Sequence, residues 1–169
     1  MTTYFEPIKG AGAERRDELG NFNKAYRDHP HRGSDWGFTT GSAGKPIYAI
    51  TSATVTKNWF DERLGWSLIT KNGGDDNFIE YNHLQEQSPL KRGTRIVGGE
   101  TVIGLIGCTG SALSASGANH LHASCAPAPV PHAASYAILK DLFKLIGEAP
   151  KPAAKPAAKP AAKKPAAKK

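Results

Sequence analysis

His120 and His122 are separated by a single leucine in the sequence. Side chains alternate between the two faces of a β-strand, so a strand here would place both imidazoles on one face and the leucine on the other. The apolar run 101–107 before them is typical of a strand, and residues 109–117, rich in Gly, Ser and Ala, are typical of a loop. We therefore expect a hairpin-like unit that presents two neighbouring imidazoles, as a metal or proton-transfer site requires.

A second group of side chains that could do chemistry is His31 and Asp35, which frame the pattern His-x-Gly-x-Asp. Gly33 allows the tight backbone that would bring the imidazole and the carboxylate together. Two nitrogens, one carboxylate oxygen and an open fourth position are what a catalytic zinc ion prefers. His83 follows a predicted strand. An isolated histidine is usually a surface or capping residue, but four histidines and one aspartate in three compact motifs indicate a site.

The elements that must position these side chains are short strands. Runs rich in β-branched and aromatic residues, separated by Gly-rich turns, predict strands at 46–50, 51–56, 66–70, 77–81 and 101–107. We expect a mainly β fold, built as a small antiparallel sheet or sandwich. Residues 1–30 are expected to be irregular, with one or two helical turns at 14–18, and residues 31–37 to form a polar turn.

A single C-terminal α-helix is predicted over residues 132–148. Its apolar side chains recur at helical spacing and form one stripe that would pack across the end of the sheet: Tyr136, Leu139, Leu142, Phe143 and Ile146. The folded domain is therefore expected over residues 1–149. Residues 150–169 repeat Lys-Pro-Ala-Ala three times, and such a segment forms neither a helix nor a core, so we expect a disordered tail there.

The net charge of +7 belongs to this tail. Seven lysines and no acid lie in residues 151–169, so the first 150 residues carry fifteen basic and fifteen acidic side chains. We expect the tail to attract anionic polymers, membrane surfaces or nucleic acid in a salt-dependent manner. Charge alone does not separate these partners.

Two further observations concern redox state and location. Cys108 and Cys125 form no disulfide framework, and both a bridge between them and two small buried thiols remain open. The first residues lack the basic and apolar regions of a signal peptide, and no apolar run approaches the about 20 residues that span a bilayer. We expect a monomer without a transmembrane segment, made in the cytoplasm, which needs another route to act outside the cell.

Three stretches, 31–35, 81–84 and 117–122, resemble in the same order the three signatures of the lysostaphin/LytM-like zinc metallopeptidases. Connecting segments resemble that family as well: 44–49, 93–104 and 108–110. The resemblance covers residues 20–126, which we expect to be the core of a metallopeptidase domain.

This resemblance implies a role for each of the five residues. His31, Asp35 and His122 would bind zinc, and a water would fill the fourth position. His120 would be the general base that takes a proton from the water, and His83 would orient or stabilise the tetrahedral intermediate.

The sequence departs from the family at several positions. Residues 123–125, Ala-Ser-Cys, stand where the family commonly has an aromatic and an acid, so the hydrogen-bonded support of the zinc ligands stays open. His29 is an additional imidazole, either a surface residue or an alternative ligand. Several aromatic side chains could wall a substrate groove with loop 111–117 or pack in the core: Trp36, Phe38, Trp59, Phe60 and Trp66.

The function that the resemblance implies is hydrolysis of stem-peptide or cross-bridge bonds in bacterial peptidoglycan. A stand-alone domain of this kind resembles a bacteriolytic phage endolysin, released by a holin or carried in a virion. The alternative is an interaction protein with the metallopeptidase fold, whose tail binds nucleic acid or wall polymer, and a third hypothesis is a regulator of a host hydrolase. Inactive relatives typically lose ligands, and all five positions are present here, so we favour the enzyme.

Overall fold

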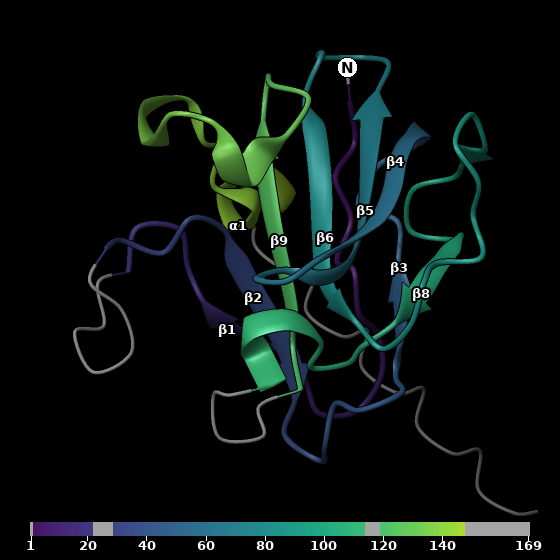
Figure 1. Ribbon diagram of the computed structural model, residues 1–169, viewed down its shortest axis with the longest axis vertical. Helices are drawn as coiled ribbons and strands as arrows, with labels where there is room; N and C mark the ends of the chain where they lie inside the picture. The colour runs from purple at the N-terminus through teal and green to yellow at the C-terminus, as the bar shows by residue number, and fades with distance from the viewer. Residues whose placement is uncertain (1, 22–28, 114–118, 148–169) are drawn as a thin grey trace, which may run out of the picture.

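The computed structural model describes residues 2–21, 29–113 and 119–147. Its elements follow one another along the chain as nine strands, three 3-10 turns and one short helix (Figure 1). They are β1 (Ala13–Asp17), β2 (Ser34–Phe38), β3 (Pro46–Tyr48), β4 (Ala53–Asp61), β5 (Gly65–Asn72), β6 (Phe78–Leu84), β7 (Arg95–Ile96), β8 (Val102–Leu105), η1 (Gly110–Leu113), β9 (Leu121–Ala126), η2 (Pro131–Ala133), η3 (Tyr136–Ile138) and α1 (Leu142–Ile146).

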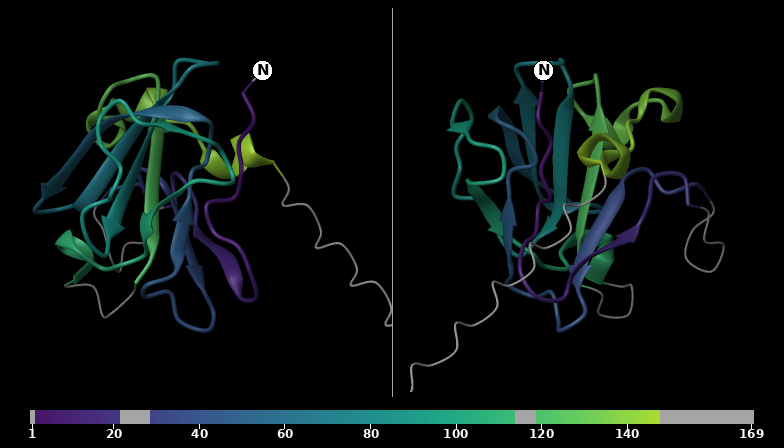
Figure 2. Two further views of the ribbon diagram at one scale, coloured as in Figure 1. Left: turned by 90° about the vertical axis from the view of Figure 1, so that its right-hand side faces the viewer. Right: turned by 180° about the vertical axis from the view of Figure 1, so that it is seen from behind.

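Seven of the strands form one antiparallel sheet in the order β1-β2-β9-β6-β5-β4-β7, and β3 pairs with β8 in a second sheet. Figure 1 shows β9 near the middle of the large sheet, between β2 and β6. Seen from behind, the N-terminal segment runs down over the large sheet, roughly along its strands (Figure 2). The expected mainly β, antiparallel fold with one C-terminal α-helix is confirmed.

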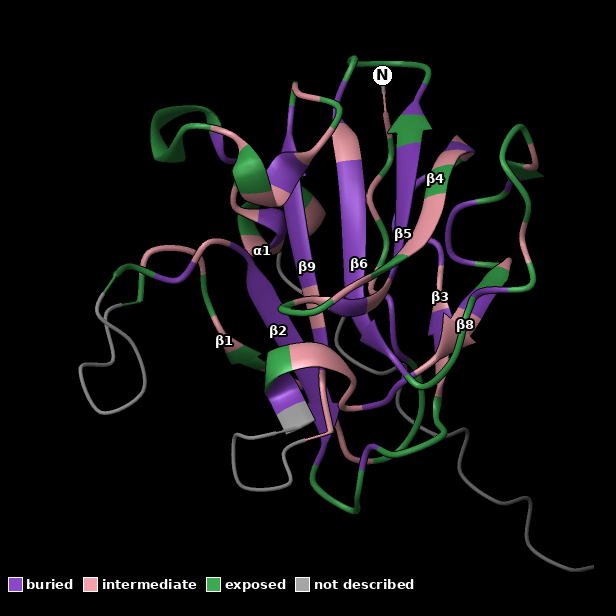
Figure 3. Cartoon of the chain, in the orientation of Figure 1, coloured by how far each residue is buried: buried purple, intermediate pink, exposed green. Residues whose placement is uncertain are grey.

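The alternation of side chains along β9 separates the core from a second, polar face. Leu121, Ala123 and Cys125 pack in the hydrophobic core. His122 and Ser124 alternate with them and therefore lie on the opposite face of the sheet. Figure 3 shows that most of β9, β6 and β2 is buried, so this polar face is largely covered.

The polar face continues across the neighbouring strands. His122 pairs with Asp35 of β2 on one side and with Asn82 of β6 on the other, and Ser124 pairs with Glu80 of β6. Directly opposed residues in a sheet project to the same side. The side chains that can do chemistry therefore come from three adjacent strands and share one face.

The core on the other face is made by residues that are distant in sequence. The second sheet contributes Ile47 and Ile103, the N-terminal segment contributes Ile8, and α1 contributes Leu142, all at most 4% exposed. These elements lie against the large sheet because a small β-domain can bury its apolar face only under such a cover.

Two local predictions for the N-terminal part are wrong. Residues 14–18 do not form helical turns, because Ala13–Asp17 is strand β1, paired with β2. Residues 31–37 are not simply a polar turn, because Ser34–Phe38 is the fully buried strand β2. This strand is covered on both faces, so its mixed composition hides the alternation that would reveal a half-exposed strand.

The expected hairpin-like unit around His120 and His122 is also wrong. β8 pairs with β3 in the second sheet, whereas β9 lies between β2 and β6 in the large one. His120 precedes β9, whose first residue is Leu121. The two histidines therefore differ in their backbone setting, since only His122 is held by strand pairing.

The C-terminal helix is shorter than predicted. Residues 131–138 contain the two 3-10 turns η2 and η3, and the α-helix comprises Leu142–Ile146. The backbone is extended at Leu139, with ψ 141°, which interrupts the helical stripe. Asp141 then caps α1 by accepting hydrogen bonds from two backbone N–H groups. Leu139 and Leu142 are buried as expected, but Tyr136 is 41% exposed.

Three other expectations concern cysteines, membrane spans and the tail. Cys108 and Cys125 are both free thiols, half-buried and buried respectively. Across the described residues, the chain contains no helix that is both long and apolar enough to cross a membrane. The predicted tail, 150–169, lies outside the described residues, as do residues 114–117 of the predicted loop.

Candidate metal centre and active site

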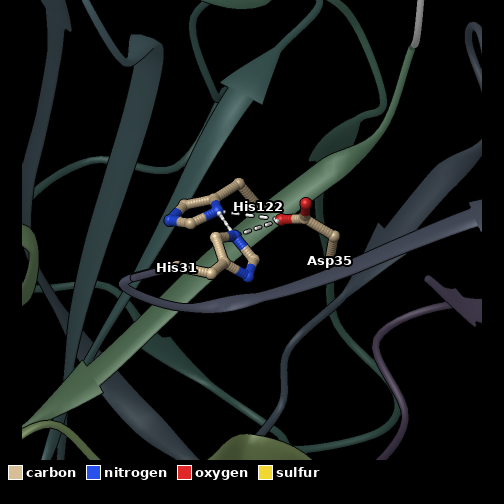
Figure 4. Close-up of side chains that lie close together, drawn as sticks. All are labelled: His31, Asp35 and His122. Carbon is tan, nitrogen blue, oxygen red and sulfur yellow. Dashed lines mark hydrogen bonds and ion pairs between the residues drawn. The ribbon is translucent and has the colours of Figure 1, made fainter. Parts of the chain in front are cut away.

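Three side chains converge on one point of the polar face. His31 Nε2 lies 3.0 Å from His122 Nδ1 and 3.2 Å from Asp35 Oδ1, and His122 Nδ1 lies 2.8 Å from the same Asp35 oxygen (Figure 4). These three residues are the predicted zinc ligands, and the structure brings them together as a group that could hold a metal ion.

Strand pairing and one glycine produce this convergence. Asp35 of β2 lies directly opposite His122 of β9, so the two side chains project from neighbouring strands to the same side. His31 reaches them from the turn before β2. A Cβ atom at Gly33 would lie 2.4 Å from Ala123 O and 2.7 Å from His122 Cε1, so the close approach of this turn to β9 requires glycine.

The atoms behind each imidazole determine which nitrogen carries its proton. His31 Nδ1 lies 3.0 Å from Glu18 O, and a carbonyl only accepts, so Nδ1 is the donor. His122 Nε2 lies 3.2 Å from Ser124 Oγ, whose hydroxyl already donates to Arg32 O, so Nε2 is the donor there. Both imidazoles therefore turn a lone pair toward the Asp35 carboxylate.

This arrangement fits a zinc ion. Two nitrogen lone pairs and a carboxylate oxygen at mutual distances of 2.8–3.2 Å repel one another unless positive charge lies among them. In a tetrahedral zinc site with bonds of about 2.0–2.1 Å, neighbouring ligand atoms are roughly 3.3 Å apart. The chemistry and the spacing of the donors thus match zinc.

The protonation states are also those that a metal needs. Burial would raise the pKa of the Asp35 carboxyl, but the adjacent imidazoles of His122 and His31, which donate hydrogen bonds to it when they are protonated, hold that pKa well below its usual range. Burial lowers the pKa of His122, although the Asp35 carboxylate opposes this shift. At neutral pH a carboxylate and a neutral imidazole result, and these are the forms that bind metal.

Two further imidazoles lie beside this group. The His120 and His83 ring centres are 4.9 Å apart, and those of His83 and His122 are 6.0 Å apart. His120 Nε2 lies 3.9 Å from Asp35 Oδ2. All five predicted site residues are therefore neighbours, with His120 and His83 beside the three converging atoms rather than among them.

An unusual backbone conformation turns His83 toward the site. Its φ is 61°, in the left-handed region, which interrupts the alternation of side chains after Asn82. His83 Nδ1 donates to Thr109 O at 2.9 Å, so Nε2 carries the lone pair in the neutral ring. Burial, with the neighbouring His120 and His122, lowers the pKa of His83 to about 4. The ring is therefore neutral at physiological pH.

All five site residues lie in a segment that matches a known protein family. The profile of Peptidase family M23 matches residues 29–130, which is more than half of the chain. The chain belongs to peptidase family M23. The predicted resemblance to lysostaphin/LytM-like peptidases is thereby confirmed.

Solved structures show the same fold. The catalytic domain of the antimicrobial peptidase lysostaphin from Staphylococcus simulans superposes with a TM-score of 0.62 at 21% identity, covering 79% of this chain and 91% of that one. The catalytic domain of the prophage-encoded M23 protein EnpA from Enterococcus faecalis superposes with a TM-score of 0.58 at 24% identity, covering 72% of this chain and 86% of that one. A zinc-containing peptidase from Vibrio cholerae superposes with a TM-score of 0.62 at 21% identity. The match covers 80% of this M23 chain and 40% of the Vibrio chain. No curated protein matches.

The remaining residues that the sequence suggested for the site of this M23 chain lie outside the group of three converging side chains. His29 is exposed and outside the converging group. Trp36 and Phe38 are buried in the core, so they do not wall a groove, whereas Phe60 is 51% exposed and packs edge-on against Trp66. Trp59 is half-buried.

Sequence reasoning missed the residues that hold the site imidazoles. Glu18 and Thr109 do so with backbone carbonyls, which any residue type carries, so the sequence contains no signal for them. Ser124, within the 123–125 stretch that departs from the family, accepts a hydrogen bond from His122. The question left open for support of this ligand is therefore answered by a serine hydroxyl.

Proposed function

We propose that this M23 peptidase is a zinc-dependent endopeptidase that hydrolyses peptide bonds of bacterial peptidoglycan. One observation carries the proposal: His31, Asp35 and His122 aim two lone pairs and a carboxylate at one point, with two more imidazoles beside it. A structural role accounts poorly for five such side chains on one face, because buried polar groups without a cation would repel one another.

His31 Nε2, Asp35 Oδ1 and His122 Nδ1 are the atoms that would hold zinc. Zinc, when bound, acts as a Lewis acid that lowers the pKa of a coordinated water and polarises a carbonyl. We assign removal of the proton from the attacking water to His120, which lies beside the ligands without belonging to them. His83 is neutral and its Nδ1 is occupied, so its Nε2 accepts a hydrogen bond and orients the reactants.

The substrate class rests on the resemblance to wall-lytic peptidases of the lysostaphin type, one of which is described as antimicrobial. The test is digestion of purified walls of several cross-link chemistries, with mass spectrometry of the released fragments. We expect new amino termini at peptide bonds, their loss with a chelator and their return with zinc. Glycan fragments alone, or release that a chelator leaves unchanged, would contradict the proposal.

The alternative interaction protein would keep the fold and lose the chemistry. All five site residues lie together here, which favours the enzyme. Four expectations stay predictions. They are the role as a phage lysin, release by a holin or from a virion, the monomeric state, and electrostatic contact of residues 150–169 with wall polymer or membrane.

A further inference from the structure

Ser124 links the ligand His122 to the backbone of the other ligand motif. His122 Nε2 lies 3.2 Å from Ser124 Oγ, and this hydroxyl donates to Arg32 O at 2.9 Å. Ser124 is 0% exposed, so solvent does not reach the hydroxyl. Because the hydroxyl proton points to Arg32, only its lone pairs face His122, and these fix the tautomer that leaves Nδ1 free for a metal.

The side chain of Arg32 continues this connection to the chain after β9. Its Nε donates to His132 O at 3.0 Å, and a terminal nitrogen donates to Ala134 O. We call residues 131–134 the strap. A guanidinium bound to two carbonyls of the strap holds the Arg32 backbone, and with it the carbonyl that Ser124 requires.

Glu80 in turn holds the strap on the polar face of the sheet. Its two carboxylate oxygens lie 2.9 Å from the backbone nitrogen of His132 and 2.7 Å from His132 Nδ1. Glu80 is 0% exposed and lies opposite Ser124 in the pairing of β6 with β9. Burying a carboxylate is costly unless its oxygens are hydrogen-bonded, so Glu80 and His132 stabilise each other's position.

We propose that the strap is a positioning element for the metal ligand His122. Glu80 holds His132, the strap holds Arg32, and Arg32 holds the hydroxyl of Ser124 that orients the imidazole. An imidazole that is already oriented loses less conformational freedom when it binds a metal, so this series of hydrogen bonds raises the affinity for zinc. The inference rests on the proposed function, since it concerns the same metal site.

The test measures the zinc Kd of the full chain by competition with a chromophoric chelator, together with thermal unfolding of the metal-free protein. Ser124→Ala removes the hydroxyl that accepts a hydrogen bond from His122, and we expect it to raise the zinc Kd about 10-fold or more. Ser124→Thr keeps a hydroxyl and should stay within about 3-fold of the original Kd. Arg32→Ala releases the strap and should weaken zinc roughly 5-fold, although its side chain contacts no ligand.

Arg15→Ala is the matched control. Arg15 also donates to carbonyls of the C-terminal part, Phe143 O and Gly147 O, but it has no link to Ser124. We expect it to lower the unfolding temperature and leave the zinc Kd unchanged.

Each contrary result has a distinct meaning. An unchanged zinc Kd in Ser124→Ala would contradict the claim that the Ser124 hydroxyl orients His122 for metal binding. Equal weakening of zinc by Arg32→Ala and Arg15→Ala overturns the role of the strap, because it would reflect general loss of stability. If the unmodified chain binds no zinc at all, the proposed function fails as well, so the two failures are distinguishable.

Discussion

At the scale of single residues, the atom behind each imidazole decides what that imidazole can do. A backbone carbonyl accepts the Nδ1 proton of His31 and of His83, and a hydroxyl accepts the Nε2 proton of His122. Identical side chains thus present lone pairs in different directions. His120, one residue outside β9, lies beside the converging atoms and not among them, which is the placement expected of the proposed general base.

His120→Ala is expected to retain zinc and to lose hydrolysis by at least about 10²-fold, because a general base typically contributes that much. Asp35→Ala should lose both, since it removes one of the three converging ligand atoms. Zinc content by atomic absorption and hydrolysis of a soluble peptide separate the two variants. A His120→Ala variant with normal hydrolysis would show that the base lies elsewhere.

The buried His83 predicts how stability depends on pH. Its pKa in the folded protein is about 4, below the ordinary value of 6.5, so the unfolded chain binds this proton more strongly. The metal-free protein should therefore lose stability as pH falls from 6.5 toward 4, by about 3 kcal/mol at most from this residue. Urea unfolding of the metal-free protein at pH 7 and pH 4.5 measures the loss.

His83→Gln provides the comparison, because glutamine does not titrate in this range. Its free energy of unfolding should fall less between the two pH values than that of the unmodified protein. Equal losses in both proteins would mean that His83 is protonated in the folded state at pH 4.5.

At the scale of elements, the turn between β4 and β5 positions His83 through a contact with residues 109–111. Trp66 N donates to Thr109 Oγ1 at 3.0 Å, and Ser111 N donates to Arg63 O at 2.8 Å. His83 N donates to Leu64 O, at the same turn. The unusual backbone of His83 is therefore held from both sides, which is how a strained conformation persists at a functional site.

Gly65 is the position where this contact is tightest. Its φ is +70°, and a Cβ atom would lie 2.1 Å from Thr109 Oγ1 and 2.6 Å from Thr109 O. We expect Gly65→Ala to cost about 2–4 kcal/mol of stability and to lower hydrolysis, because it displaces the carbonyl that holds His83.

Gly73→Ala is the control, since nothing lies within 4 Å of a Cβ there. Its free energy of unfolding should stay within about 0.5 kcal/mol of the original value. Urea titrations of the two variants make the comparison, and equal costs would contradict the tight packing inferred at Gly65.

At the scale of the whole molecule, the site joins parts of the chain that are far apart in sequence. Asp35 lies on β2, His31 lies just before that strand, and His122 lies on β9, so a bound metal would connect two strands in the large sheet. Strand pairing sets the register of β2 and β9, and both strands contribute to the core on the opposite face. Metal binding at the proposed site would therefore be coupled to folding.

Zinc at 1,000 times its Kd should stabilise the folded state by about 4 kcal/mol and raise the unfolding temperature by roughly 10 °C. Differential scanning calorimetry with and without zinc measures this shift. Asp35→Ala is expected to abolish it, and an equal shift in that variant would place the stabilising zinc elsewhere.

The sequence by itself determined the chemistry and the fold class. Residue types at short spacings, His-x-Gly-x-Asp and His-x-His, together with Tyr-Asn-His-Leu, identify the candidate ligands and bases, because their chemistry resides in the side chains. Strand propensity and Gly-rich turns predict an antiparallel β fold for the same reason, since these signals are local.

Only the tertiary structure decided how these residues are arranged. β8 and β9 appear as a hairpin along the chain but belong to different sheets, because strand partners are chosen by burial of both faces. The buried β2 and the left-handed His83 break the local alternation on which sequence reasoning depends. The difference between His120 and His122 arises from the neighbours that folding brings to each ring, and no local signal encodes those neighbours.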